Sequence, residues 1–219
     1  MRPRDLNRFL DDIGWADSPQ LPESTPADAA PNVEASSLEV LARTVQACTL
    51  CRLAEKRRSV VFGEGSPQAP VMFIGEGPGA EEDRTGRPFV GQAGQLLDRM
   101  IVAMGFARTD VYIANVVKCR PPGNRDPQDD EAAACAPYLD RQIELIRPQV
   151  IVALGKPAAR RLTGSTKPIG ALRGRWSSYR GTPLMPTFHP AYLLRTPSAK
   201  RDVWEDLKKV MQRLESTVG

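Results

Sequence analysis

The sequence predicts an α/β fold, a three-layer α/β/α sandwich around a central parallel sheet of four strands. Short apolar runs without polar alternation are typical of strands that are buried on both faces. Segments whose apolar residues follow helical spacing separate these runs. The expected strands cover residues 71–75, 111–117, 149–155 and 184–188.

Helices are expected between and around these strands, on both faces of the sheet. They cover residues 38–47, 92–104, 127–146, 156–163 and 198–215. Asp126 is expected to cap the third of them, because aspartate favours the N-cap position and Pro127 fits the first helical turn. The sequence contains no internal repeat.

Residues 1–37 differ in composition from the rest of the chain. Residues 15–37 are rich in Pro, Ala, Ser and acidic residues. They bury too little apolar surface to offset the entropy of ordering, so we expect a disordered extension before a folded domain at 38–219. Four apolar residues near the N-terminus follow helical spacing: Leu6, Phe9, Leu10 and Ile13. A docking helix for a protein partner and a transient helix without a role both remain open.

Charge is distributed unevenly along the chain. Residues 1–38 carry three arginines and seven acidic residues, a net charge of −4, which leaves +8 on the rest of a chain whose total is +4. A basic body favours a polyanionic partner such as nucleic acid, although a generic soluble surface also fits. No apolar run approaches a membrane span of roughly 18 residues, and the N-terminus lacks a signal-peptide core. We therefore expect a cytoplasmic monomer without membrane contact.

The cysteines form a pattern. Cys48 and Cys51 make a C-x-x-C pair, and Cys119 and Cys135 follow singly. This spacing favours a four-cysteine iron–sulfur site that joins distant segments of the chain. Structural zinc, which prefers two close pairs, and four unrelated buried thiols remain alternatives. A disulfide framework is not expected in a cytosolic chain of this length.

Polar residues follow the predicted strands at the same end. Glu76 follows the first, Asn115 lies near the end of the second, Lys156 follows the third and His189 follows the fourth. Ligands of open α/β sheets bind outside the carboxyl ends of the strands. We therefore expect Glu76, Asn115 and His189 to converge on one pocket, although a strand-end asparagine or a lone histidine is often only structural.

The loop Gly75–Gly79 resembles a phosphate cradle but matches neither G-x-G-x-x-G nor the P-loop. Its glycines instead allow the backbone to approach a flat ligand closely, or simply to make a tight turn. Phe89 lies near this loop in the sequence. His189 is the only histidine, and the sequence has no G-x-S-x-G elbow, which argues against a serine-hydrolase scheme.

Three motifs together match a known family. They are GEGPGAEED at 75–83 continuing through TGRPFVG at 85–91, NVVKCRPP at 115–122, and HPAY at 189–192. In these motifs the chain resembles the family 4 uracil-DNA glycosylases, which are bacterial and archaeal iron–sulfur enzymes. The resemblance covers residues 40–215 and includes all four cysteines. Gly77 is a small departure, because the family commonly has alanine there.

The resemblance implies a [4Fe–4S] cluster held by Cys48, Cys51, Cys119 and Cys135 and a pocket for uracil that has been flipped out of DNA. The implied uracil-binding residues are Gly75, Glu76, Gly77, Phe89, Asn115 and His189. Phe89 would stack on the base and Asn115 would read its edge. His189 would donate to the O2 atom of the leaving uracil, and Glu76 would position water.

The resemblance also implies contacts with single- or double-stranded uracil-containing DNA and release of free uracil. Residues 189–195 are expected to form a loop at the same edge of the sheet. Leu193 in this loop is expected to wedge into the gap left by the flipped base, with ordinary packing under the loop as the alternative. Arg195, Lys200 and Arg201 are expected to contact phosphates.

Two other functional classes remain open at this point. A non-catalytic nucleic-acid binder would not need the polar trio at the strand ends, and an electron carrier would not need a pocket. A related branch traps uracil-DNA covalently through an extra histidine, but the loop 121–126 contains none. We therefore expect turnover.

Overall fold

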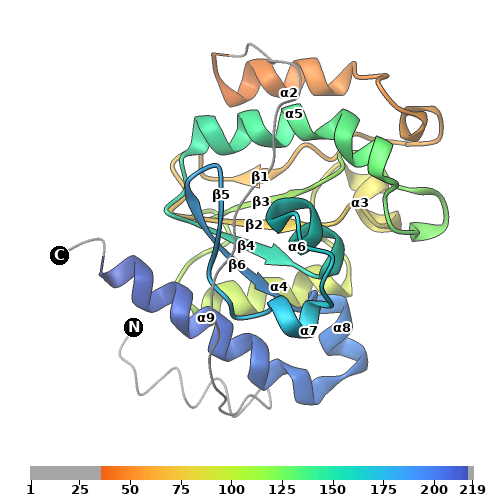
Figure 1. The fold of residues 1–219 in the computed structure, drawn as a ribbon. Helices are drawn as coiled ribbons and strands as arrows, with labels where there is room; N and C mark the ends of the chain where they lie inside the picture. Colours follow the sequence, from red (N-terminus) through yellow and green to blue (C-terminus); the bar gives the residue numbers. More distant parts are fainter. Residues whose placement is uncertain (1–35, 217–219) are drawn as a thin grey trace.

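The computed structural model describes residues 36–216 and contains a six-stranded sheet in the order β1-β3-β2-β4-β6-β5 (Figure 1). The four inner strands are mutually parallel. They are β2 (Val71–Gly75), β3 (Tyr112–Asn115), β4 (Val150–Leu154) and β6 (Thr182–Thr187). The predicted α/β fold and its four parallel strands are therefore confirmed.

Two short antiparallel strands, which the sequence analysis did not predict, extend the sheet at its edges. They are β1 (Glu64–Gly65), which pairs with β3, and β5 (Ser177–Tyr179), which pairs with β6. Both strands are too short to show the alternation of apolar and polar residues by which a strand is recognised in a sequence. The sheet therefore has six strands rather than the predicted four.

Helices cover both faces of the sheet (Figure 1). They are α2 (Leu38–Gln46), α3 (Ala80–Thr85), α4 (Gln92–Ala103), α5 (Asp129–Ile146), α6 (Lys156–Thr163), α7 (Ile169–Leu172), α8 (Pro190–Arg195) and α9 (Lys200–Glu215). Short 3₁₀ turns lie at η1 (Arg52–Glu55), η2 (Pro122–Asn124) and η3 (Pro197–Ala199).

The core is divided between the two faces by the alternation of side chains along each strand. In β2, Met72 and Ile74 pack into one apolar cluster together with α2, α5 and α6, whereas Val71 and Phe73 pack into another together with α4, α8 and α9. All five residues of β2 and of β4 are buried. Burial on both faces explains why these strands are continuously apolar in the sequence.

Two details of the predicted elements are wrong. Helix α5 begins at Asp129, and its N-cap is Gln128 rather than Asp126, because the Glu131 carboxylate accepts the Gln128 backbone N–H at 2.8 Å. The segment expected to be a loop after His189 is helix α8, which begins at Pro190. Proline at the first helical position is favourable because the first N–H groups of a helix have no partner within it.

The expectations for residues 1–35, including the short helix containing Leu6, lie outside the described residues. Within residues 36–216, no helix is long and apolar enough to cross a membrane.

Candidate functional site

A pocket of about 470 Å³ opens beside the carboxyl ends of β2, β3 and β6. Glu76, Asn115 and His189 all line it, so the predicted convergence of these three residues is confirmed. Phe89 and Gly77 line it as well. Lys156, which follows β4, lies instead in a neighbouring pocket with Arg160 and Arg161.

Asn115 lies at the end of β3, paired in register with Gly75 of β2. Its side chain is only 1% exposed, and its Oδ1 atom has no hydrogen-bond partner. A β-carbon on Gly75 would lie 2.5 Å from this oxygen and 2.5 Å from the Phe89 ring, so only glycine fits between them. A buried acceptor without a partner is costly, and a ligand that donates a hydrogen bond relieves that cost.

His189 caps α8, and its Nδ1 atom accepts the Ala191 backbone N–H at 3.1 Å. Burial lowers the pKa of His189 to about 4, so the ring is neutral at pH 7. Because Nδ1 is an acceptor, the proton of the neutral ring resides on Nε2, which is left to donate. Gly155, at φ +88°, packs beneath the imidazole, where a β-carbon would lie 2.9 Å from the His189 Cβ.

Glu76 follows β2 directly. Its pKa is raised to about 7, first by burial and then by the nearby charge of Asp126. A carboxyl group that titrates near neutrality can act as an anion or as a proton acceptor at physiological pH. Glu76 lines the same pocket as Asn115 and His189.

Phe89 adopts a left-handed backbone conformation, φ +51°, which is unusual for an aromatic residue. Its ring stacks on His189 with centroids 5.5 Å apart. On one side, Glu82 holds the segment, because its Oε1 atom accepts the N–H groups of Val90 at 2.8 Å and Gly91 at 3.0 Å. The other carboxylate oxygen of Glu82 accepts the Gly79 N–H at 3.1 Å, which ties the glycine loop to the Phe89 segment.

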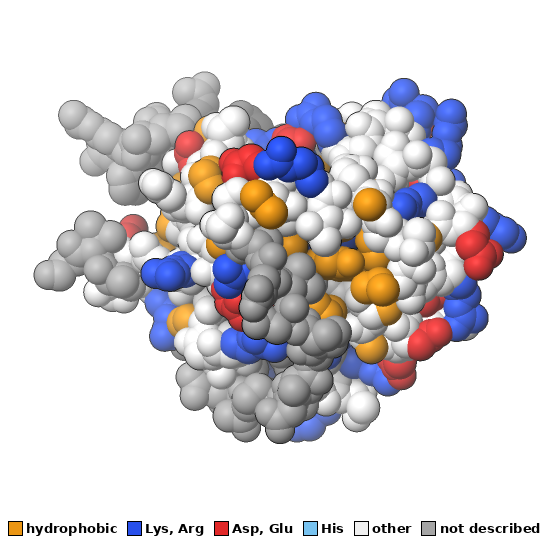
Figure 2. All heavy atoms as spheres, turned by 90° about the horizontal axis from the view of Figure 1, so that it is seen from above, with side chains coloured by type: hydrophobic (Ala, Val, Ile, Leu, Met, Phe, Trp, Pro, Cys, Tyr) orange, Lys and Arg blue, Asp and Glu red, His pale blue; other side chains and the backbone are white. Residues whose placement is uncertain are grey.

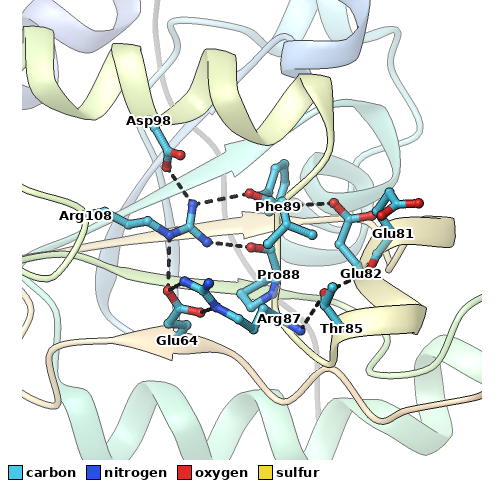
Figure 3. Close-up of polar contacts among 10 residues, drawn as sticks. Glu64, Glu81, Glu82, Thr85, Arg87, Pro88, Phe89, Asp98 and Arg108 are labelled. Carbon is cyan, nitrogen blue, oxygen red and sulfur yellow. Dashed lines mark hydrogen bonds and ion pairs between the residues drawn. The ribbon is translucent and has the colours of Figure 1, made fainter.

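On the other side, Arg108 holds the same segment (Figure 3). Its guanidinium donates to the carbonyls of Pro88 at 2.5 Å and Phe89 at 3.3 Å. Asp98 at 2.6 Å and Glu64 at 3.2 Å orient that guanidinium. Surrounding contacts of this kind maintain an unfavourable φ at a functional site.

The four cysteines surround a small pocket of about 10 Å³ between α2, η1 and α5. Among residues 36–216, no three Cys, His, Asp or Glu side chains are arranged to hold a single metal ion. Four thiols around one space are a donor set that both iron–sulfur clusters and zinc use. Arg57 donates to the Cys119 sulfur at 3.3 Å, and the Lys118 backbone N–H donates to the Cys135 sulfur at 3.3 Å. Donors to sulfur are typical of such sites.

The expected DNA wedge, Leu193, is fully buried in the core cluster and cannot reach a ligand from there. It points inward because α8 packs against α4 on that face. Its neighbours Tyr192 and Leu194 are 37% and 42% exposed, and Arg195 lines the pocket.

Lys200 and Arg201 begin α9, just after α8 and η3, and Arg201 is exposed. Figure 2 shows the face on the α2 side, where Lys and Arg side chains are spread around the rim, so charge alone does not locate a binding surface there.

The match to a family model decides the relationship: residues 62–208 match the model described as Uracil DNA glycosylase superfamily. The chain belongs to this superfamily. A Type-4 uracil-DNA glycosylase of Thermotoga maritima is 49% identical, over 78% of this chain and 92% of that protein. Its counterpart in Saccharolobus solfataricus is 45% identical, over 82% and 88%. A Type-5 uracil-DNA glycosylase of Pyrobaculum aerophilum is 32% identical, over 71% and 75%.

The sequence analysis missed Glu82 and Arg108. Glu82 had a local signal, because a glutamate three residues after the N-cap Gly79 is the second half of a capping box. Arg108 had no local signal in the sequence, because its partners Glu64 and Asp98 lie 44 and 10 residues away along the chain.

Proposed function

We propose that this chain is a DNA-repair glycosylase that flips uracil out of DNA and hydrolyses its N-glycosidic bond, releasing uracil and leaving an abasic site. The observation that carries the proposal is the partnerless Oδ1 of Asn115 in a pocket that has room for a base and that a neutral His189 also lines. Membership of the uracil DNA glycosylase superfamily supports the same activity.

Asn115 selects the base. Its Oδ1 accepts the N3–H of uracil and its amide N–H donates to O4. Cytosine has an acceptor where uracil has N3–H and a donor where uracil has O4, so cytosine would leave buried polar groups mispaired, at about 1–3 kcal/mol for each group. Phe89 supplies the ring on which the base stacks, as aromatic side chains do with unpaired bases.

His189 stabilises the leaving group. Cleavage leaves negative charge on uracil O2, and the Nε2–H of the neutral ring is the donor available for it. Preorganised donors of this kind contribute about 3–4 kcal/mol. Gly77 lines the pocket, so its backbone lies close to the base. Gly75 does not line it, but a side chain there would collide with Asn115 and Phe89 and so disturb the residues that bind the base.

Glu76 orients the attacking water and, as an anion, favours the positive charge that develops on the sugar. Its raised pKa keeps it near half ionised at neutral pH, which suits a group that accepts a proton as water adds. The glycosidic bond breaks with its electron pair going to uracil, and the hydroxyl of water joins the sugar carbon.

We assign a [4Fe–4S] cluster to Cys48, Cys51, Cys119 and Cys135, on the fit of the four thiols around one pocket. When bound, the cluster cross-links the segment after α2 to the loop after β3 and to α5. Cluster chemistry takes no part in the hydrolysis, which the pocket residues perform.

DNA contacts follow from the elements around the pocket mouth. Arg195 lines the pocket and Lys200 and Arg201 begin α9, and we propose that these three residues contact phosphates near the flipped nucleotide. The exposed side chains of Tyr192 and Leu194 replace Leu193 as the apolar residues available to the DNA. We also propose a cytoplasmic monomer.

The test is strand scission after alkali on an oligonucleotide with one uracil, using anaerobically purified full-length protein. Scission at uracil, but not at cytosine or thymine, is expected. Asn115→Asp should lose most of the activity, because a carboxylate cannot donate to O4. If the wild type bound the oligonucleotide without scission, the protein would instead be a non-catalytic nucleic-acid binder.

A further inference from the structure

Lys118 is an unusual residue for its position. Its side chain is 1% exposed, and it is among the largest fully buried side chains of the described residues. Its ammonium group donates to the Asn115 carbonyl at 2.9 Å and to Gln142 Oε1 at 2.5 Å. Both acceptors are neutral. Burying an ammonium group without an opposite charge is expensive, so a counter-charge is expected nearby.

No carboxylate within residues 36–216 pairs with Lys118. The ionisable groups that act on it are the thiols of Cys135 and Cys119. Lys118 also donates its backbone N–H to the Cys135 sulfur. Four thiolate ligands bring negative charge to this site when a cluster is bound, and nearby charges and hydrogen bonds tune such clusters. A bound cluster would therefore supply the counter-charge that Lys118 lacks.

The same ammonium group is linked to the uracil pocket through Asn115, although Lys118 itself lines only the cysteine pocket. The carbonyl that it holds belongs to Asn115, whose amide reads the base. Gln142 lies on α5, two turns after Cys135, and its Nε2 atom donates to the Phe62 carbonyl at 2.9 Å. One buried side chain thus joins the cysteine site, helix α5 and the end of β3.

We propose that Lys118 is a positioning residue that provides the counter-charge of the iron–sulfur cluster and couples cluster occupancy to the placement of Asn115. This inference rests on the proposed function, because it takes the cluster and the uracil pocket as given. Lys118 touches neither the base nor the reacting atoms. It acts through the backbone carbonyl of Asn115 and through the electrostatics of the cysteine site.

The first measurement is the rate of iron release from the full-length protein to a chelator, which is monitored as the loss of cluster absorbance. Lys118→Met removes the charge at similar volume, and release should be about tenfold faster, because one partner of a buried charge pair is lost. Lys209→Met is the matched control. Lys209 is also buried, but it lies on α9 beside Asp206 and donates to the Gly174 carbonyl. The control should release iron at the wild-type rate.

The second measurement is the dissociation constant of free uracil. Lys118→Met should weaken uracil binding about tenfold while the cluster is still present, because the Asn115 carbonyl loses a charged donor. Removing the cluster should weaken uracil binding in the wild type but much less in the variant. Lys118→Gln, which keeps a donor without the charge, is the second variant if the methionine form does not fold; iron release should still accelerate.

Unchanged iron release and unchanged uracil binding in both Lys118 variants would overturn the inference. Failure of the proposed function is a different result. In that case the wild type itself would lack iron or would not bind uracil.

Discussion

The pocket has two walls that are built in different ways. The sheet wall consists of Glu76, Asn115 and His189, which follow or end strands β2, β3 and β6. The loop wall consists of Phe89 and its neighbours at 88–91, which lie between α3 and α4. Hydrogen bonds of the sheet and the core place the first wall, whereas side-chain charges place the second.

The difference shows how chemistry and positioning are divided. The sheet wall carries polar groups whose properties are set by burial, a carboxyl with raised pKa and an imidazole with lowered pKa. The loop wall carries an aromatic ring, and four of its backbone groups are held by Glu82 and Arg108. Mutations in the sheet wall should therefore reduce the rate of the chemical step, and mutations around the loop wall should mainly weaken binding of the base.

The largest effect is expected at His189. His189→Ala removes the donor to uracil O2 and should lower the single-turnover rate by about 10²–10³-fold. It also removes the N-cap of α8, so the loss must be separated from unfolding. His189→Asp keeps an N-cap acceptor but has no donor. It should fold and remain as inactive as the alanine variant; an active aspartate variant would remove His189 from its assigned role.

A pH profile tests the other titrating group of the sheet wall. In the proposed mechanism Glu76 acts as an anion, and its pKa is about 7, so the single-turnover rate should rise between pH 5 and 7 by about tenfold per unit and level off above. His189 is already neutral between pH 5 and 7, so its titration adds no further change of rate in this range. Glu76→Gln should be slower and should lose the rise. The same rise in the glutamine variant would assign the titration to another group.

The loop wall should respond more weakly, first at Glu82. Glu82→Gln weakens three backbone hydrogen bonds that join the glycine loop to the Phe89 segment, and uracil binding should fall by about fivefold with a smaller change in the rate of the chemical step. Glu81→Gln is the matched control, since Glu81 is an exposed residue of the same helix and pairs with Arg84. The measurement is the dissociation constant of uracil for each variant. Equal weakening in the two variants would contradict the role of Glu82 in holding the Phe89 segment.

The smallest effect is expected at Arg108. Arg108→Met leaves the carbonyls of Pro88 and Phe89 without their donor and should weaken uracil binding about two- to threefold, because Glu82 still holds the segment. Arg87→Met, an exposed arginine that shares Glu64, should leave binding unchanged. The double variant Glu82→Gln with Arg108→Met should lose more than the product of the single losses, since each residue supports the segment when the other is absent.

The sequence determined the fold class and the sheet wall because both depend on short-range patterns. Continuous apolar runs marked the four parallel strands. A polar residue directly after such a strand must lie at the carboxyl edge of the sheet, because the end of the strand lies there. Thus Glu76, Asn115 and His189 were found without coordinates. The cysteine spacing likewise predicted one site for four thiols, and the structure places them around one pocket.

Only the tertiary structure decided the contacts that join distant segments. Leu193 and Leu194 are adjacent and chemically alike, yet the packing of α8 buries one and exposes the other. Arg108 and Lys118 are unremarkable basic residues in the sequence, and their roles arise from partners that the fold brings to them. Sequence patterns report how each element meets the core. Which side chain fills a given gap between elements depends on packing in three dimensions, which no local pattern encodes.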